Sequence, residues 1–208
     1  MVELRGVAIE KTPGVEPAHD VHHVLRVAAN AERIAKDEAA NVDVCVAAAL
    51  LHELFNYPKG HPESKRSGEV CAEHAVRVLR DLGWNETEVE SVAYAIRVHP
   101  FSLGIVPDTL EAKVLQDADR LDAIGAIGIA RCFATCADMK RPFYAPDDPF
   151  CTEREPDDKL WGIDHFYRKL LKLEHGLHTR TARDMAKRRV AFMGLYLDEL
   201  AVEISAVP

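Results

Sequence analysis

Several histidines of this chain stand at positions where a helix should be apolar. His23 lies on the apolar stripe of an expected helix, and His52 and Glu53 end the apolar run AALLHE. His99 ends another apolar stripe, and His61 lies in the loop between these two helix ends. One histidine on an apolar face is more often a hydrogen-bonded core residue than a ligand. Several that converge beside carboxylates favour a catalytic divalent metal, whose usual ligands are imidazole and carboxylate.

The segment QDADRLDAIGAIGIA supplies further carboxylates. Because an α-helix turns about 100° per residue, Asp117 and Asp119 lie about 200° apart, and only one of them can face a given pocket. Asp119 and Asp122 lie about 60° apart and share a face. A surface position, or an ion pair with Arg120, would explain any one of these carboxylates. The small apolar residues that follow predict a tightly packed helix instead, and the pattern leaves open which aspartate serves a site.

Common catalytic motifs are incomplete or absent from the sequence. The run HELFN at residues 52–56 begins like the metalloprotease motif HExxH, but Asn56 stands where the second histidine is required. No GxGxxG, GxxxxGK[ST] or GxSxG pattern occurs. The five cysteines form no CxxC pair and most fall inside predicted helices, which favours reduced, buried thiols over a disulfide framework or a zinc knuckle.

The elements that must position these residues are helical, and no convincing alternating strand pattern occurs. We expect an all-α fold in one compact domain. The segment from Leu110 to Cys136 is expected to form one long helix, and residues 138–158 form the only long irregular stretch. One further predicted helix contains His23, and two begin at the caps Asn41 and Asn85. Another begins at Ser67, and the last two span residues 158–174 and 181–203.

The motifs together resemble one known family. HDVHHVLRV, AALLHE and LQDADRLDAIGAIGIA resemble the HD superfamily of metal-dependent phosphohydrolases, most closely its small YpgQ/YedJ-like branch, over about residues 17–200. The resemblance implies a division into three parts: an N-terminal extension at residues 1–16, a metal-binding core at 17–137, and a loop or lid with C-terminal helices, packed on the same domain, at 138–208. It also implies one divalent metal held by His23, by the doublet His52–Glu53, and by Asp119.

One residue departs from the family pattern. The doublet that names the family is His-Asp, whereas this chain has His52–Glu53. Glutamate is one methylene longer, so it can still reach a metal, although its carboxylate coordinates differently. The resemblance as a whole implies an enzyme that hydrolyses nucleotide phosphoester or phosphoanhydride bonds, such as a nucleoside triphosphate pyrophosphohydrolase or a nucleotidase. The alternative is a catalytically weakened module that binds a nucleotide and regulates a partner.

Further roles follow from the expected phosphoryl chemistry, which needs positioning and charge neutralisation. Lys59, His61 and Arg120 are candidate phosphate ligands, His99 could assist catalysis or hold a second ion, and Asp122 could orient a histidine. The metal could be Mn, Fe, Co, Ni, Zn or Mg, because mixed nitrogen and oxygen ligands suit most divalent ions.

Composition narrows the class of partner. The formal net charge is −8, which argues against a surface that coats nucleic acid but allows a local pocket for a phosphorylated small molecule. No apolar run approaches the roughly 18–20 residues that cross a bilayer, and no signal peptide is evident, so we expect a cytoplasmic protein without a membrane partner. The C-terminal helical face could support a homodimer.

Overall fold

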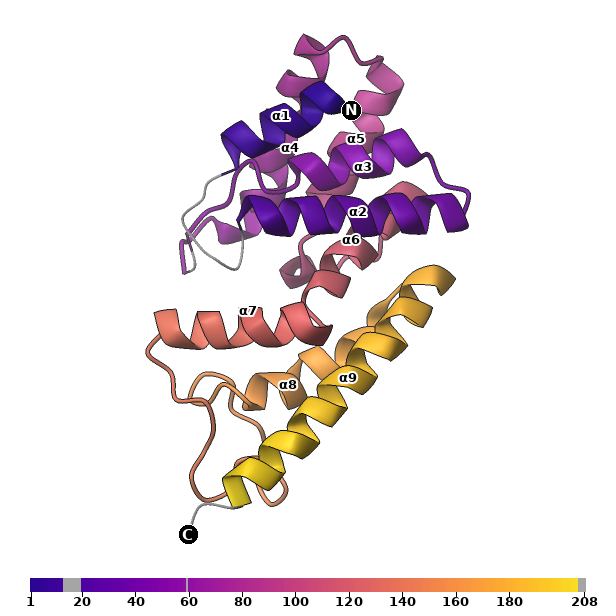
Figure 1. Cartoon of the computed structure of the whole chain (residues 1–208). Coiled ribbons are helices and arrows are strands. Elements are labelled where there is room, and N and C mark those ends of the chain that lie inside the picture. Colours follow the sequence, from indigo (N-terminus) through magenta and orange to yellow (C-terminus); the bar gives the residue numbers. More distant parts are fainter. Residues whose placement is uncertain (13–19, 59, 206–208) are drawn as a thin grey trace. The chain divides into compact units, whose positions relative to one another are not determined.

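The computed structural model of the protein describes residues 1–12, 20–58 and 60–205 (Figure 1). Within these ranges the chain is helical and has no strand, which confirms the predicted all-α fold. None of the described helices is both long and apolar enough to span a membrane. The α-helices are α1 (Val2–Lys11), α2 (Val21–Asp37), α3 (Val42–Leu51), α4 (Ser67–Asp81), α5 (Glu86–Val98), α6 (Leu110–Asp122), α7 (Gly125–Asp138), α8 (Asp164–Arg168) and α9 (Arg180–Ser205), with the 3-10 helices η1 (Ser64–Arg66), η2 (Phe101–Leu103) and η3 (Leu170–Gly176).

The helices form two compact units. The first unit comprises Met1–Asp119 with His178–Ala182, and the second comprises Arg120–Leu177 with Arg183–Pro208. Each unit draws on segments from both sides of residue 137. The boundary expected there, between a metal-binding core and a C-terminal part, stays a prediction.

Helix α3 forms the centre of the first unit. Its sequence VDVCVAAALL is apolar nearly all round, as expected for a central helix, and seven of its ten residues are buried. Helices α1, α2 and α5 pack on α3, and α4 packs on α5. Helix α1 was not predicted, because its pattern is weakly amphipathic, yet Leu4 and Ala8 are buried in the core.

Side-chain caps mark where four helices of the first unit begin, namely α2, α3, α5 and α6. Asp20 accepts a hydrogen bond from the backbone N–H of His23 at the start of α2. The predicted caps Asn41 and Asn85 accept hydrogen bonds from the backbone N–H of the third residue after each, at N···O distances of 3.2 and 3.0 Å. Thr109 caps α6 in the same way. These bonds satisfy backbone donors that a helix start leaves open, so the polar residues set the register of the apolar faces.

The predicted long helix from Leu110 to Cys136 is wrong, because the chain breaks between α6 and α7. Gly125 has φ of +79°, a left-handed conformation that favours glycine, and Ile124 before it is extended. A Cβ on Gly128 would lie 2.2 Å from the carbonyl oxygen of Ala123, so the new helix starts with a close backbone approach. The helical phase calculated from Asp117 to Asp122 holds within α6, but it does not extend past Asp122.

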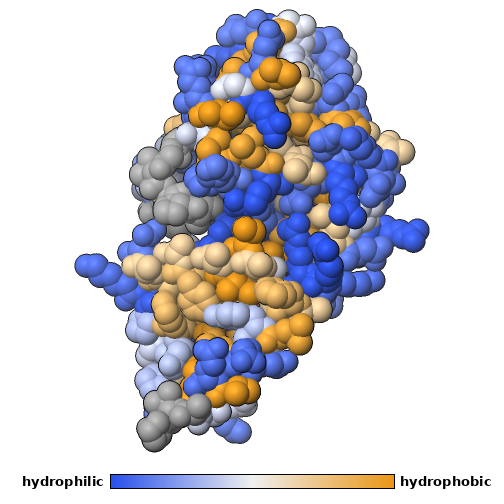
Figure 2. All heavy atoms as spheres, viewed as in Figure 1, coloured by the Kyte–Doolittle hydropathy of each residue, from blue (hydrophilic) through white to orange (hydrophobic). Residues whose placement is uncertain are grey.

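The second unit contains α7, α8 and most of α9. The predicted helix over residues 158–174 is wrong, since α8 begins only at Asp164 and η3 follows it. The bidentate pair from Arg154 to the buried Asp164 anchors the irregular stretch before α8. Ring contacts join α7 to α9, with Phe133 and Tyr196 centroids 6.2 Å apart. Figure 2 shows that the surface over α7 is largely apolar.

Candidate metal centre

Two buried histidines of the first unit face each other. The Nε2 atoms of His23, in the first turn of α2, and His52, at the C-terminal cap of α3, lie 3.3 Å apart. Nδ1 of His52 lies 2.7 Å from the carbonyl oxygen of Ala49, so this nitrogen donates its proton and Nε2 carries the lone pair. Burial, with His23 beside it, lowers the pKa of His52 despite the neighbouring carboxylates. The ring is therefore neutral near pH 7 and can act as a ligand.

Asp119 of α6 completes this cluster. Its Oδ1 lies 3.5 Å from Nε2 of His23, and one ligand atom from each of His23, His52 and Asp119 lies within 4.8 Å of the others. Burial raises the pKa of Asp119, but His23, His52 and His99 reverse this and leave the pKa lowered. The carboxylate is thus ionised and 28% exposed. A charged oxygen and two imidazole nitrogens this close together fit a divalent cation.

Glu53 lies beside the two histidines. Its Oε1 is 4.0 Å from Nε2 of His23 and 4.0 Å from Nε2 of His52. The side chain is mostly buried, at 12% exposed. A distance of 4.0 Å leaves room for an ion between oxygen and nitrogen, because metal bonds to each are about 2.0–2.2 Å. The assignment of Glu53 as a metal ligand stays a prediction.

His99 extends the cluster from α5. Its ring centroid lies 5.3 Å from that of His52 in an edge-on arrangement, and its Nδ1 lies 2.6 Å from the carbonyl oxygen of Ile96. Burial, together with His52, lowers the pKa of His99. The neutral ring therefore keeps Nε2 as a proton acceptor.

The cluster opens into a pocket of about 180 Å³ in the first unit. Gly68 brings α4 close to α5 at this place, since a Cβ there would lie 2.8 Å from the carbonyl oxygen of Arg97. Sequence reasoning missed the uncharged polar lining, because single serines carry no motif. Besides the acidic and histidine side chains, the pocket is lined by Phe55, Asn56, Ser64, Ser67, Gly68, Pro100 and Ser102.

The other predicted site residues lie in different settings. His61 stacks on Tyr57 at 4.6 Å, and its Nδ1 accepts from the N–H of Glu63. Arg120 and Asp122 belong to the second unit, where Arg120 donates to the carbonyl of Gly176. Asp122 is buried and accepts from Arg131 at 2.8 Å. Lys59 lies outside the described residues. The catalytic roles of these four stay predictions.

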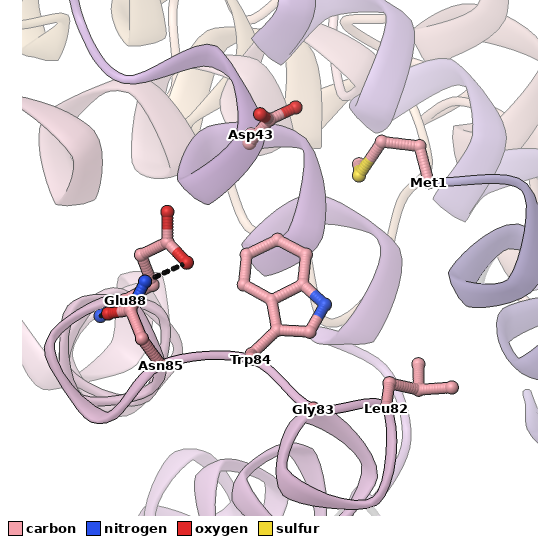
Figure 3. Close-up of a pocket in the computed structure, with 7 residues that line it drawn as sticks. All are labelled: Met1, Asp43, Leu82, Gly83, Trp84, Asn85 and Glu88. Atoms are coloured by element: carbon pink, nitrogen blue, oxygen red, sulfur yellow. Dashed lines mark hydrogen bonds between the residues drawn. The ribbon is translucent and has the colours of Figure 1, made fainter.

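A second pocket of the first unit has different chemistry. It measures about 430 Å³ and includes no histidine among its lining residues. Figure 3 shows the indole of Trp84, from the loop between α4 and α5, with Glu88 on one side, Met1 on the other and Asp43 above it. Its donor set does not match the mixed imidazole and carboxylate ligands of a catalytic metal.

Comparison with known proteins identifies the relationship. Residues 20–124, which include His23, His52 and Asp119, match the HD domain family. The chain belongs to this family. It is 32% identical to YpgQ of Bacillus subtilis over 193 residues, which cover 91% of this chain and 86% of YpgQ.

Solved structures extend the match to the whole chain. The crystal structure of B. subtilis YpgQ in complex with ADP aligns with a TM-score of 0.76 at 30% identity, covering 100% of this chain and 99% of that one. The crystal structure of an HD-superfamily hydrolase from Bacillus thuringiensis aligns with a TM-score of 0.78 at 28% identity, covering 99% and 96%. The chain therefore has the all-helical HD fold of these proteins, and the relationship places it among the HD-superfamily hydrolases.

Proposed function

We propose that this HD-family chain is a metal-dependent phosphohydrolase that cleaves phosphoanhydride or phosphoester bonds of nucleotides. The observation that carries the proposal is the convergence of His23, His52 and Asp119, whose ligand atoms lie within 4.8 Å of one another beside a pocket. The ADP complex of the relative YpgQ supports a nucleotide as the ligand class.

The residues of this chain divide the work of such a reaction. His23, His52 and Asp119 would hold the divalent ion, with Glu53 as a further ligand. When bound, that ion supplies Lewis-acid polarisation of a phosphoryl oxygen and activation of water. The lowered pKa of Asp119 keeps its carboxylate negative, and Glu53 would add a second carboxylate to the ligand set, which suits a divalent cation.

His99 would take part in the proton transfer. Water attacks phosphorus, the P–O bond to the leaving phosphate breaks, and the proton of the water passes to a base. Nδ1 of His99 already donates to the Ile96 carbonyl, so Nε2 is the atom that takes this proton. Ser64, Ser67 and Ser102 line the same pocket and offer neutral hydroxyl donors to phosphate oxygens.

The test pairs metal content with product analysis. The purified protein, a His52→Ala variant and an Asp119→Ala variant are assayed with Mn²⁺ for release of phosphate and of pyrophosphate from a nucleotide panel. We expect wild-type turnover with near-stoichiometric metal, and loss of both in the two variants. His22→Ala is the matched control, since His22 is the exposed neighbour of His23 on α2. Metal binding that survives in both site variants would contradict the ligand assignment.

Glu53 favours a second candidate function, a nucleotide-binding module with weak catalysis. The residue replaces the aspartate of the family doublet, and its longer side chain changes the position of the carboxylate against His52. A module of this kind binds nucleotide and metal but shows little turnover. The variant Glu53→Asp decides between the two functions. If the wild type shows little turnover and Glu53→Asp gains turnover, the nucleotide-binding module is supported. An active wild type supports the enzyme.

A further inference from the structure

The loop between α5 and α6 forms one wall of the pocket beside the candidate metal centre. His99, Pro100 and Ser102 all line this pocket. Between residues 100 and 105 only Pro100 and Leu103 are half-buried, and the other side chains are exposed. A segment that buries so little of its own surface depends on hydrogen bonds to its backbone to keep one conformation.

Gln116 of α6 supplies such bonds at both ends of the loop. The residue is buried, at 1% exposed. Its amide nitrogen donates to the carbonyl oxygen of Val98 at 3.0 Å and to the carbonyl oxygen of Ile105 at 2.9 Å. Val98 is the last residue of α5 and directly precedes His99. Both protons of one buried amide group are therefore used on the backbone that flanks the loop.

His178 fixes the orientation of this amide group. Its Nε2 lies 2.8 Å from Oε1 of Gln116. Because the amide nitrogen faces two carbonyl groups, the amide oxygen faces His178, and Nε2 of His178 donates the proton. The backbone N–H of His178 donates to Asp117, which holds the imidazole next to Gln116. Only one orientation of the amide satisfies all three bonds.

We propose that Gln116 is a positioning residue for His99. By holding the carbonyl groups of Val98 and Ile105, it keeps the ring of His99 in place beside the metal ligands. This inference rests on the proposed function, in which Nε2 of His99 takes the proton of the attacking water. Asp119 lies three residues after Gln116 on α6, so one helix carries a proposed metal ligand and also sets the place of the base.

Hydrogen exchange tests the effect of Gln116 on the loop. The variant Gln116→Met keeps the length of the side chain and removes the amide group. The amides of Leu103 and Gly104 report the order of the loop, because they donate to Pro100 and Phe101 within it at 3.1 and 3.2 Å. We expect both to exchange at least about tenfold faster in Gln116→Met than in the wild type.

Two further variants accompany this measurement. His178→Phe keeps the backbone bond to Asp117 and removes the ring donor, so it should show a smaller increase in exchange and keeps the test valid if Gln116→Met does not fold. Thr12→Val is the matched control, because it also removes a buried side-chain hydrogen bond, from Thr12 to the carbonyl of Ala8. The control should leave the exchange of the loop unchanged. Circular dichroism verifies that all variants are folded.

Turnover tests whether Gln116 acts through His99. With Mn²⁺ added, Gln116→Met should lower kcat about tenfold or more, because small displacements of a reacting group are costly. Its affinity for Mn²⁺ should change less than about threefold, since the metal ligands are intact. In a His99→Ala background, Gln116→Met should lower kcat less than about twofold further, because the group it positions is already gone.

The outcomes separate this inference from the proposed function. Unchanged exchange of Leu103 and Gly104 in both Gln116→Met and His178→Phe would overturn the inference, whether or not the wild type is active. An unchanged kcat in Gln116→Met, or losses that multiply fully in the double variant, would overturn the action through His99. A wild type that binds Mn²⁺ without hydrolysing any nucleotide would overturn the proposed function and the positioning role with it.

Discussion

Asp117 and Asp119 are separated by one residue, yet the structure gives them opposite tasks. Asp117 is fully buried and accepts hydrogen bonds from the backbone N–H of His178, the backbone N–H of Thr179 and the hydroxyl of Thr179. Asp119 faces His23 at the proposed metal site. Replacing each aspartate by alanine should therefore separate stability from metal binding.

The bonding of Asp117 sets the size of the expected loss. Asp117→Ala leaves three donors without their acceptor in a buried place, and each such donor costs about 1–3 kcal/mol. The loss is reduced in two ways. The hydroxyl of Thr179, which also accepts from the N–H of Ala182, can turn to another acceptor, and burial raises the pKa of Asp117, so removing its charge relieves some desolvation. We expect Asp117→Ala to lower the free energy of unfolding by about 3 kcal/mol.

Asp119→Ala should behave differently. Its carboxylate is 28% exposed and lies beside histidine rings at the edge of the pocket, so the free energy of unfolding should change by less than about 1 kcal/mol in the absence of metal. Metal binding should fall by orders of magnitude, because one of the proposed ligands is lost.

Urea unfolding followed by circular dichroism measures both effects, in chelator so that bound metal does not add to stability. Metal content measured after dialysis against Mn²⁺ reports the site. The reasoning would be refuted if Asp119→Ala were as destabilising as Asp117→Ala, or if Asp117→Ala kept full stability while losing the metal.

Other substitutions test further contacts. Gly125→Ala should lower the free energy of unfolding by about 2 kcal/mol or more, because the residue has positive φ and a Cβ would lie 3.1 Å from the side chain of Arg189. Gly83 also has positive φ but has open space around it, so Gly83→Ala should lower the free energy of unfolding by only about 1 kcal/mol. Urea unfolding of both variants compares the two losses. Burial raises the pKa of Asp164, but its hydrogen bonds, above all those from Arg154, outweigh burial and leave the pKa lowered. The ionised carboxylate therefore stabilises the fold above pH 3.8, and this stabilisation is lost as the pH falls below that value. The difference in unfolding free energy between the wild type and Asp164→Asn should shrink over the same pH range. His99→Ala should retain metal and lose about 10²-fold or more in turnover, measured by phosphate or pyrophosphate release.

Local chemistry explains which parts of the fold could be predicted from sequence. The caps Asn41 and Asn85 form the expected bonds, because a cap needs only residues within one turn. The phase argument within α6 also holds, since Asp117 and Asp119 point to different partners. Both rest on backbone geometry that neighbouring residues determine.

The features that sequence missed depend on residues far apart in the chain. The break before Gly125 was not predicted, because a glycine in an apolar run is also compatible with a continuous helix; its positive φ and close neighbours appear only in the fold. Asp122 has a short-range sequence context that suggests a site, yet its carboxylate pairs with Arg131 nine residues later in the next helix. The serines of the pocket come together from separate segments and carry no motif.

The ends of α3 and α5 show how a buried helix can orient a ligand as well as position it. The last carbonyl groups of a helix have no partner within the helix. His52 and His99 both occupy the C-terminal cap, and Nδ1 of each lies within hydrogen-bond distance of the carbonyl three residues earlier, that of Ala49 or Ile96. One bond thus satisfies an unpaired carbonyl, selects the tautomer and leaves Nε2 as the reactive nitrogen. An apolar run that ends in histidine therefore predicts the protonation state of the ring as well as its place at the rim of the core.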